Sequence, residues 1–186
     1  MKNQNTQLIV RTALLLAITL LFQQLRLILG VTPASTIIIG SLVNLALFVS
    51  AATVGWKGSI FVAALSPVVS ALQGHLPHPL MIPFVAAGNL VLVIAFELVE
   101  RRSNSTLRIG AGIAVAAVLK TITLYCLVVL LFVPSILPGL GLKAQVSKAL
   151  VANFGVQQLF TAAIGGVVSI PVIKAVRRAL DRRSNG

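Results

Sequence analysis

Long apolar stretches follow one another along the whole chain and leave only short polar segments between them. Because an α-helix rises about 1.5 Å per residue, roughly 20 apolar residues cross the hydrocarbon core of a bilayer, which is about 30 Å thick. Only 10% of the residues are charged, so the chain lacks the polar surface that a soluble domain needs to face water. The sequence therefore predicts an all-α integral membrane protein with a single domain over residues 1–186.

The apolar stretches predict a bundle of six transmembrane helices. Their approximate ranges are 8–29, 37–54, 59–72, 80–99, 109–133 and 149–176. The third stretch is short for a span and contains Pro67, so we expect it to be tilted and shallow or to be flanked by irregular backbone. The segment from Pro134 to Gly141 (PSILPGLG) predicts a turn-rich outside loop, because Pro fixes φ and Gly permits a positive φ.

The positions of the basic residues predict the orientation of this bundle. The chain has 15 Lys and Arg but only 3 Asp and Glu, which gives a formal charge of +12, and cytoplasmic loops attract Lys and Arg. With both termini in the cytoplasm, all but four of the basic residues lie on the cytoplasmic side. The exceptions are Arg26, Lys143 and Lys148 on the outside, and Lys120 within the fifth span. We therefore predict a multi-pass protein of the cell membrane and no nucleic-acid partner, with a topology fixed by the first helices alone as the alternative.

The residue types needed for catalysis and for metal binding are scarce. The three acidic residues lie at or beyond the predicted cytoplasmic boundary, and no glycine-rich loop with a Lys-Ser or Lys-Thr ending is present to hold a nucleotide phosphate. His75 and His78 are three residues apart, but no third type of metal ligand is nearby. We therefore expect no enzymatic activity, no metal and no cofactor in this chain. The scarcity of acids also argues against an ion-driven transporter.

Lys120 is the most unusual polar residue within a predicted span. It lies 12 residues after Arg108, which is about 18 Å along a helix and therefore near the middle of the membrane. A charged group at this depth is costly and faces the bundle interior or a wet cavity. One interpretation is that Lys120 meets an anionic or carbonyl group of a ligand. The other is that it makes a structural hydrogen bond to a facing Asn or Thr.

Further polar residues fall in the outer half of the membrane under the same topology. Asn153, Gln157 and Thr161 recur at every fourth position of the last predicted helix and so form one stripe. Asn44, Asn89 and Tyr125 lie at similar depth in the second, fourth and fifth spans. Together with Lys120, these residues predict a small-ligand pocket that opens to the outside. The alternative is that the amide side chains only hold helices together through hydrogen bonds.

The chain resembles the substrate-binding S components of energy-coupling factor (ECF) transporters. The resemblance rests on the six predicted helices, on Ala13 and Ala17 (ALLLA) in the first helix, and on three stretches of sequence. These stretches are GSLVNLALFVSAATV from Gly40, LSPVVSALQGH from Leu65 and IPFVAAGNLVLV from Ile82. They are similar to the vitamin-type members of that family.

The resemblance implies a division of labour between subunits. The S component captures a vitamin or related micronutrient in a pocket on its outer side, and a membrane scaffold subunit docks on the face that carries Ala13 and Ala17. Two ATPase subunits beneath the scaffold use ATP, so this chain itself needs no cofactor. The segment from Gln23 to Ser35 would be the gate of the pocket, which adds Gln23 and Arg26 to the expected substrate-binding residues. The alternative function is a small membrane scaffold or assembly protein without a ligand. The sequence does not identify the substrate.

Overall fold

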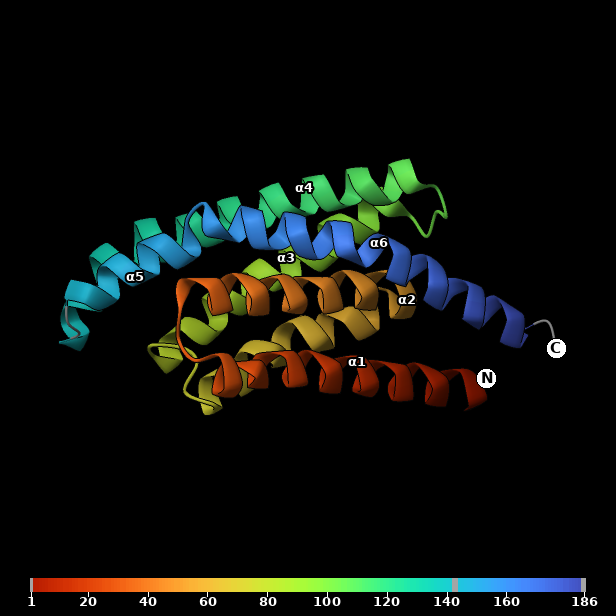
Figure 1. Cartoon of the computed structure of the whole chain (residues 1–186), viewed down its shortest axis with the longest axis horizontal. Coiled ribbons are helices and arrows are strands. Elements are labelled where there is room, and N and C mark those ends of the chain that lie inside the picture. The colour runs from red at the N-terminus through yellow and green to blue at the C-terminus, as the bar shows by residue number, and fades with distance from the viewer. Residues whose placement is uncertain (1, 142–143, 185–186) are drawn as a thin grey trace.

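The computed structural model describes residues 2–141 and 144–184, and nearly all of these residues are helical. The helical elements, in chain order, are α1 (Lys2–Leu29), α2 (Pro33–Leu72), the 3-10 turn η1 (Pro79–Met81), α3 (Ile82–Glu100), α4 (Thr106–Leu124), the π-helical segment η2 (Tyr125–Ile136), the 3-10 turn η3 (Leu137–Leu140), α5 (Ala144–Phe154) and α6 (Gln157–Ser184). Figure 1 shows them as one elongated bundle of roughly parallel and antiparallel helices. The prediction of an all-α fold is confirmed over the described residues.

The number of separate membrane-spanning helices differs from the prediction. Five stretches of the described chain are long and apolar enough to cross a membrane, not six. The difference lies in α2, whose 40 residues include both the second and the third predicted spans. Gly55 interrupts α2 with φ 72° and ψ −179°. A single residue with left-handed φ thus takes the place of the loop that the prediction put between two helices.

The two halves of α2 turn back on each other at Gly55. The guanidinium of Arg26 donates to Thr36 Oγ1, near the start of α2, and to the carbonyl oxygen of His75, just after its end. The ends of α2 therefore lie close together although the helix would be about 60 Å long if straight. In Figure 1 the orange half and the gold half of α2 run side by side in opposite directions.

The predicted turn-rich loop from Pro134 to Gly141 is only partly confirmed, because Gly141 has the expected positive φ of 62° but the residues before it are helical. Pro134 lies inside η2, and η3 continues the helical path as far as Leu140. The fixed φ of proline is compatible with a helix, and Pro138 occupies the first turn of η3, where the missing N–H costs little. The last predicted span is divided instead, because α5 ends at Phe154 and α6 begins at Gln157.

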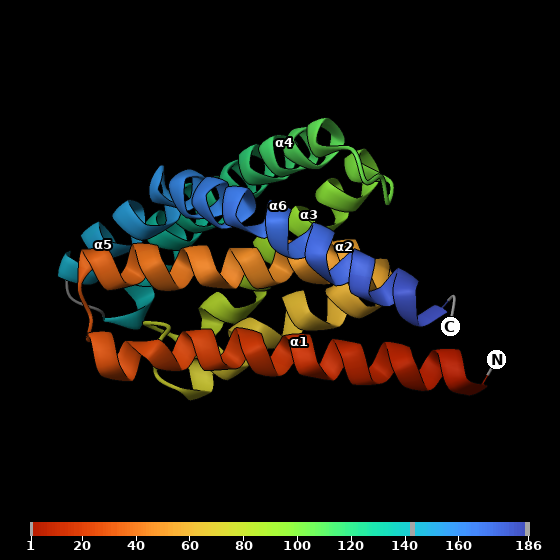
Figure 2. The same cartoon turned by 45° about the vertical axis from the view of Figure 1, so that its right-hand side comes forward.

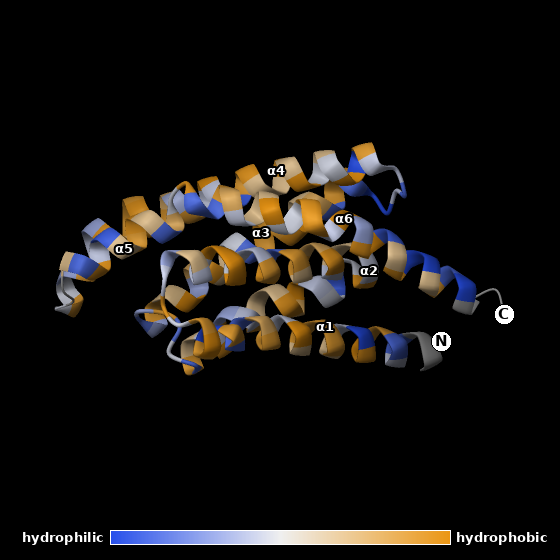
Figure 3. Cartoon of the chain, in the orientation of Figure 1, coloured by the Kyte–Doolittle hydropathy of each residue, from blue (hydrophilic) through white to orange (hydrophobic). Residues whose placement is uncertain are grey.

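The start of α1 and the end of α6 lie at the same end of the bundle (Figures 1 and 2). Figure 3 shows hydrophilic segments gathered toward the end of α6 and near the start of α1, whereas the middle of the bundle is mainly hydrophobic. This is the arrangement expected if both ends leave the bilayer on one side. Lys143, which the topology places on the outside, lies outside the described residues.

The apolar core lies between α2, α3, α4 and α6, and α1 covers one side of it. Phe48 of α2 and Phe96 of α3 pack edge to face in its centre, with ring centroids 5.1 Å apart. At Gly165 of α6, an added Cβ would come within 2.2 Å of the carbonyl oxygen of Ser41, so glycine is what allows α6 to approach the α2 backbone this closely. By contrast, only 11% of the most apolar window of α1 is buried, which leaves most of that helix uncovered by this chain.

Candidate ligand-binding site

A cavity of about 560 Å³ lies between the end of α1, both halves of α2, α3, α4, and the junction of α5 with α6. This volume is within the range of small-molecule sites. Arg26 in the last turn of α1 and Thr36 near the start of α2 both line it. The cavity is therefore at the end of the bundle opposite to the start of α1 and the end of α6. Seven of the predicted substrate-binding residues line it: Gln23, Arg26, Asn44, Asn89, Lys120, Asn153 and Gln157.

Lys120 joins three helices at the inner wall of this cavity. Its Nζ donates to Asn44 Oδ1 of α2 at 2.6 Å and to Asn89 Oδ1 of α3 at 2.9 Å. The residue is only 4% exposed. The hydrogen bond to a facing Asn, which was one of the two interpretations of Lys120, is therefore observed in the structure. Lys120 also lines the cavity, so the same side chain lies where a ligand would bind.

The other hydrogen bonds of the two asparagines fix the direction of their amide groups. Asn89 Nδ2 donates to the carbonyl oxygen of Ala63 and to Ser66 Oγ, both at 3.4 Å, and a carbonyl oxygen can only accept. Asn44 Nδ2 donates to Thr161 Oγ1 at 3.3 Å. That hydroxyl in turn donates to the carbonyl oxygen of Gln158 at 3.1 Å. Both Oδ1 atoms must therefore face Lys120.

Two glutamine side chains bring acceptor atoms to the cavity that have no hydrogen-bond partner among the described residues. Gln23 Nε2 donates to the carbonyl oxygen of Ser66 at 3.2 Å, while Gln23 Oε1 is buried and unpaired. Gln73 Oε1 is also buried and unpaired, and both residues line the cavity. Buried polar atoms are rarely left without a partner. Both oxygens are closed off from the cavity in this conformation, so each would accept from a ligand only after its amide group turns toward the cavity.

Arg26, Thr36 and His75 form the rim of the cavity. Arg26 Nη1 donates to the carbonyl oxygen of His75 at 3.2 Å, and Arg26 Nη2 reaches Thr36 Oγ1 at 3.5 Å. Partial burial, followed by the positive charge of Arg26, lowers the pKa of the His75 imidazole below its usual range. His78 has a different role, because its Nδ1 accepts from the backbone N–H of Leu80 and caps η1.

Not every residue that the sequence singled out comes to the cavity. Tyr125 begins η2, is 43% exposed and does not line the cavity. Asn153, Gln157 and Thr161 do meet there, but they do not form a stripe on one helix, because Asn153 belongs to α5 and the other two to α6.

The expected gate segment from Gln23 to Ser35 is mostly helical. Only residues 30–32 lie between α1 and α2. Thr32 and Ser35 close this connection with reciprocal side-chain to backbone hydrogen bonds at the start of α2. A long mobile loop is thus not what connects these helices.

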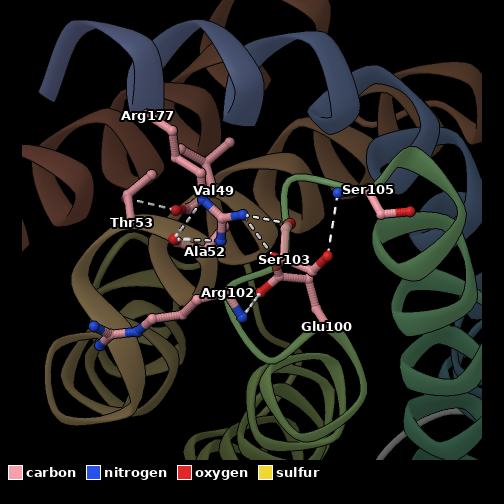
Figure 4. A network of polar contacts seen from close by, with 8 residues as sticks. All are labelled: Val49, Ala52, Thr53, Glu100, Arg102, Ser103, Ser105 and Arg177. Carbon is pink, nitrogen blue, oxygen red and sulfur yellow. Dashed lines mark hydrogen bonds and ion pairs between the residues drawn. The ribbon is translucent and has the colours of Figure 1, made fainter. Parts of the chain in front are cut away.

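Two polar features of the fold were missed by sequence reasoning. Gln73 and Ser66 line the cavity. Gln73 comes directly after the third predicted stretch and Ser66 lies inside it, and neither belongs to a periodic polar pattern. At the opposite end of the bundle, Arg177 of α6 pairs with the buried Glu100 of α3 at 2.6 Å and donates to the carbonyl oxygens of Ala52 and Ser103 (Figure 4). The sequence pointed to Arg177 only as a marker of topology.

The described part of the chain holds no group of three or more His, Cys, Asp or Glu side chains that could bind a metal ion. The arrangement instead suits reversible binding of a small organic molecule, because apolar walls surround a few fixed donors and acceptors.

Comparison with protein families gives one match of nearly full length. A family model described as "ECF transporter, substrate-specific component" matches residues 7–177. Comparisons with curated proteins and with solved structures gave no match.

Proposed function

The chain belongs to the substrate-specific components of ECF transporters, and we propose that it is the high-affinity binding subunit for a vitamin or related micronutrient. In this role it captures its substrate outside the cell and delivers it inward together with a membrane scaffold subunit and two ATPase subunits. The ATPases would supply the energy, since this chain contains no phosphate-binding loop of its own.

The observation that carries this proposal is the cavity itself. Its volume of about 560 Å³ suits a vitamin-sized molecule, and it combines apolar walls with the buried polar atoms of Lys120, Gln23 and Gln73. These polar groups come from α1, from the residue that caps the end of α2, and from α4, so a ligand that bound to them would touch separate parts of the bundle.

The position of the cavity supports uptake from the outside. The distribution of Lys and Arg favours a cytoplasmic location for both chain ends. The cavity is at the other end of the bundle, so under this topology it opens toward the outside of the cell.

The exposed face of α1 supports docking of the scaffold subunit. Ala13 and Ala17 lie one turn apart, and both are exposed. Small residues at this spacing let another helix approach closely. The low burial of α1 within this chain leaves that face available.

The proposal is tested by asking whether the purified protein retains a small molecule. We expect native mass spectrometry of gently purified protein to detect one bound vitamin-sized compound, and isothermal titration to return tight binding of that compound. Asn153→Ala, in the cavity, should weaken the binding, whereas Tyr125→Phe, outside it, should not. A protein that retains nothing and binds no member of a broad vitamin panel would instead favour the alternative of an assembly protein.

A further inference from the structure

The cavity contains two basic side chains and no acidic one among its described lining residues. Arg26 and Lys120 both line it, and their hydrogen bonds go to neutral groups: backbone and hydroxyl oxygens for Arg26, and amide oxygens for Lys120. The chain has only three acids. Glu97 and Glu100 end α3 and Asp181 is near the end of α6, all away from the cavity. No carboxylate of this chain therefore balances the charge of the cavity.

Arg26 of α1 and Lys120 of α4 contact α2 at different depths in the cavity. Arg26 reaches Thr36, and Lys120 reaches Asn44, which is two turns further along the same helix. At a rise of about 1.5 Å per residue, the two contact points are roughly 12 Å apart along the helix axis. Arg26 is thus placed to attract an anion at the rim, and Lys120 is placed to hold it inside.

The unpaired acceptor of Gln23 lies next to the Lys120 network. Gln23 Nε2 and Asn89 Nδ2 both donate to Ser66, one to its carbonyl oxygen and the other to its hydroxyl. A ligand whose negative group bonds to Lys120 would therefore lie near Gln23, and a rotation of the Gln23 amide would let its unpaired Oε1 accept an O–H or N–H of that ligand. Gln73, seven residues beyond Ser66 in the sequence, offers the second unpaired acceptor nearer the rim.

The aromatic content of the cavity limits the shape of this ligand. Among the described residues that line the cavity, the aromatic side chains are the phenyl ring of Phe154 and the imidazole of His75. Large planar ring systems bind best between aromatic faces, and a single phenyl ring cannot provide such a sandwich. The remaining wall consists mainly of aliphatic and amide side chains.

From these observations we infer that the substrate is a small aliphatic organic anion that also carries O–H or N–H donors. Lys120, held between Asn44 and Asn89, binds its negative group, and Gln23 and Gln73 accept from its donors. This inference rests on the proposed function, because it names the chemical class of the substrate in the same cavity.

The first test compares acids with neutral compounds of the same skeleton. The full chain, purified into phosphatidylcholine nanodiscs, is titrated with pantothenate and panthenol, biotin and biotinamide, and nicotinate and nicotinamide. Any compound retained through purification is identified by mass spectrometry and compared with its neutral ester or amide. We expect an aliphatic acid to bind at least 10-fold more tightly than its neutral partner.

The second test changes the charge of the cavity. Gln23→Glu adds a negative charge to the lining with little change in shape, and Gln24→Glu adds the same charge to the next residue, which does not line the cavity. We expect Gln23→Glu to weaken binding of the acid by about 10- to 100-fold, as for a lost charge-assisted hydrogen bond, and Gln24→Glu to leave it unchanged. Lys120→Met should reduce the affinity for the acid by a similar factor.

The outcomes separate the inference from the proposed function. Equal or tighter binding of the neutral compound overturns the anion inference while the transport function stands. A Gln23→Glu variant that binds the acid as well as the parent protein does has the same consequence. If the protein retains no compound and binds neither the six compounds nor any other member of the broad vitamin panel, both the proposed function and the inference are contradicted.

Discussion

Glu100 and Arg177 tie three parts of the chain together at the end of the bundle opposite to the cavity. The Glu100 side chain is fully buried, and Arg177 Nη1 lies 2.6 Å from its Oε1. The backbone N–H of Arg102 donates to the other carboxylate oxygen at 2.9 Å. The guanidinium also donates to the carbonyl oxygen of Ala52 (Figure 4). Both charges are therefore satisfied by partners from α2, from α6 and from the connection after α3.

Removing Arg177 should destabilise the protein strongly. Arg177→Met leaves Glu100 as a buried charge without its cation, which typically costs about 3 to 5 kcal/mol. Arg178→Met removes an exposed neighbour and should have little effect. Thermal unfolding in detergent, followed by circular dichroism, measures both. Equal melting temperatures for the two variants would contradict a stabilising role of the pair, and Glu100→Gln combined with Arg177→Met should recover part of the loss.

His75 should make the stability of the protein sensitive to acid. Because burial and Arg26 lower its pKa in the folded state, the unfolded chain binds a proton at His75 more readily than the folded chain does. The contribution of neutral His75 to the free energy of unfolding is therefore fully present above the ordinary histidine pKa of about 6.5. It is lost as the pH falls through the lower pKa of the folded state. We expect the melting temperature to fall between pH 7.5 and pH 5, and to fall less in His75→Asn. An identical pH profile for the variant would exclude His75 as the cause.

Among the helices, the folded-back shape of α2 depends on a single glycine, Gly55. Gly55 has φ 72° and ψ −179°, a backbone conformation that is essentially restricted to glycine and costs other residues about 1 to 3 kcal/mol. A Cβ there would also come within 2.5 Å of Arg102 Nη2, so this side chain would have to move. The antiparallel pairing of the two halves of α2 is what brings Thr36, Asn44, Ser66 and the other α2 residues to one cavity.

Gly55→Ala should therefore lower stability and disturb the cavity. We expect a lower melting temperature and weaker retention of the bound compound. Gly110→Ala is the matched control, since Gly110 lies in α4 with open space around it, and alanine favours a helix by about 1 kcal/mol there. A Gly55→Ala protein as stable as the Gly110→Ala protein would show that the break in α2 does not need a left-handed residue.

The sequence predicted the composition of the cavity better than the boundaries of the helices. Lys120, Asn44 and Asn89 could be predicted because a polar group deep in an apolar span must find a polar partner. Gly55 could not be identified as a reversal, since one residue with positive φ produces no polar loop. The loop predicted at Pro134 fails for a related reason, because proline is typical of turns but its fixed φ is also compatible with a helix.

Considered as a whole, the molecule has a buried side and an open side. α2 packs with α1, α3 and α6, while much of α1 faces away from the bundle. The exposed apolar residues Ile9, Leu14 and Leu21 lie on α1 together with Ala13 and Ala17. This surface suits lipid in the isolated subunit and a helix of the scaffold subunit in the proposed complex.

A large side chain on that face should block the proposed assembly without affecting ligand binding. We expect Ala13→Trp and Ala17→Trp to abolish co-purification with the scaffold and ATPase subunits, because a bulky ring prevents close helix approach. Ala114→Trp, at an exposed position of α4, should leave assembly intact. Retained compound measured by mass spectrometry should be the same in all three variants. Unchanged assembly of both α1 variants would remove this face from the interface.

The pairing of Glu100 with Arg177 also bears on how the protein is made. The two residues are 77 positions apart, so the ribosome has yet to synthesise α6 when Glu100 enters the membrane region. At synthesis rates of roughly 5 to 20 residues per second, about 4 to 15 s pass before Arg177 follows. During this interval the acidic end of α3 lacks its cation, and the nascent chain has to keep it near water or near the insertion machinery. The arrival of α6 is therefore the step that lets the bundle close at its cytoplasmic end under the proposed topology.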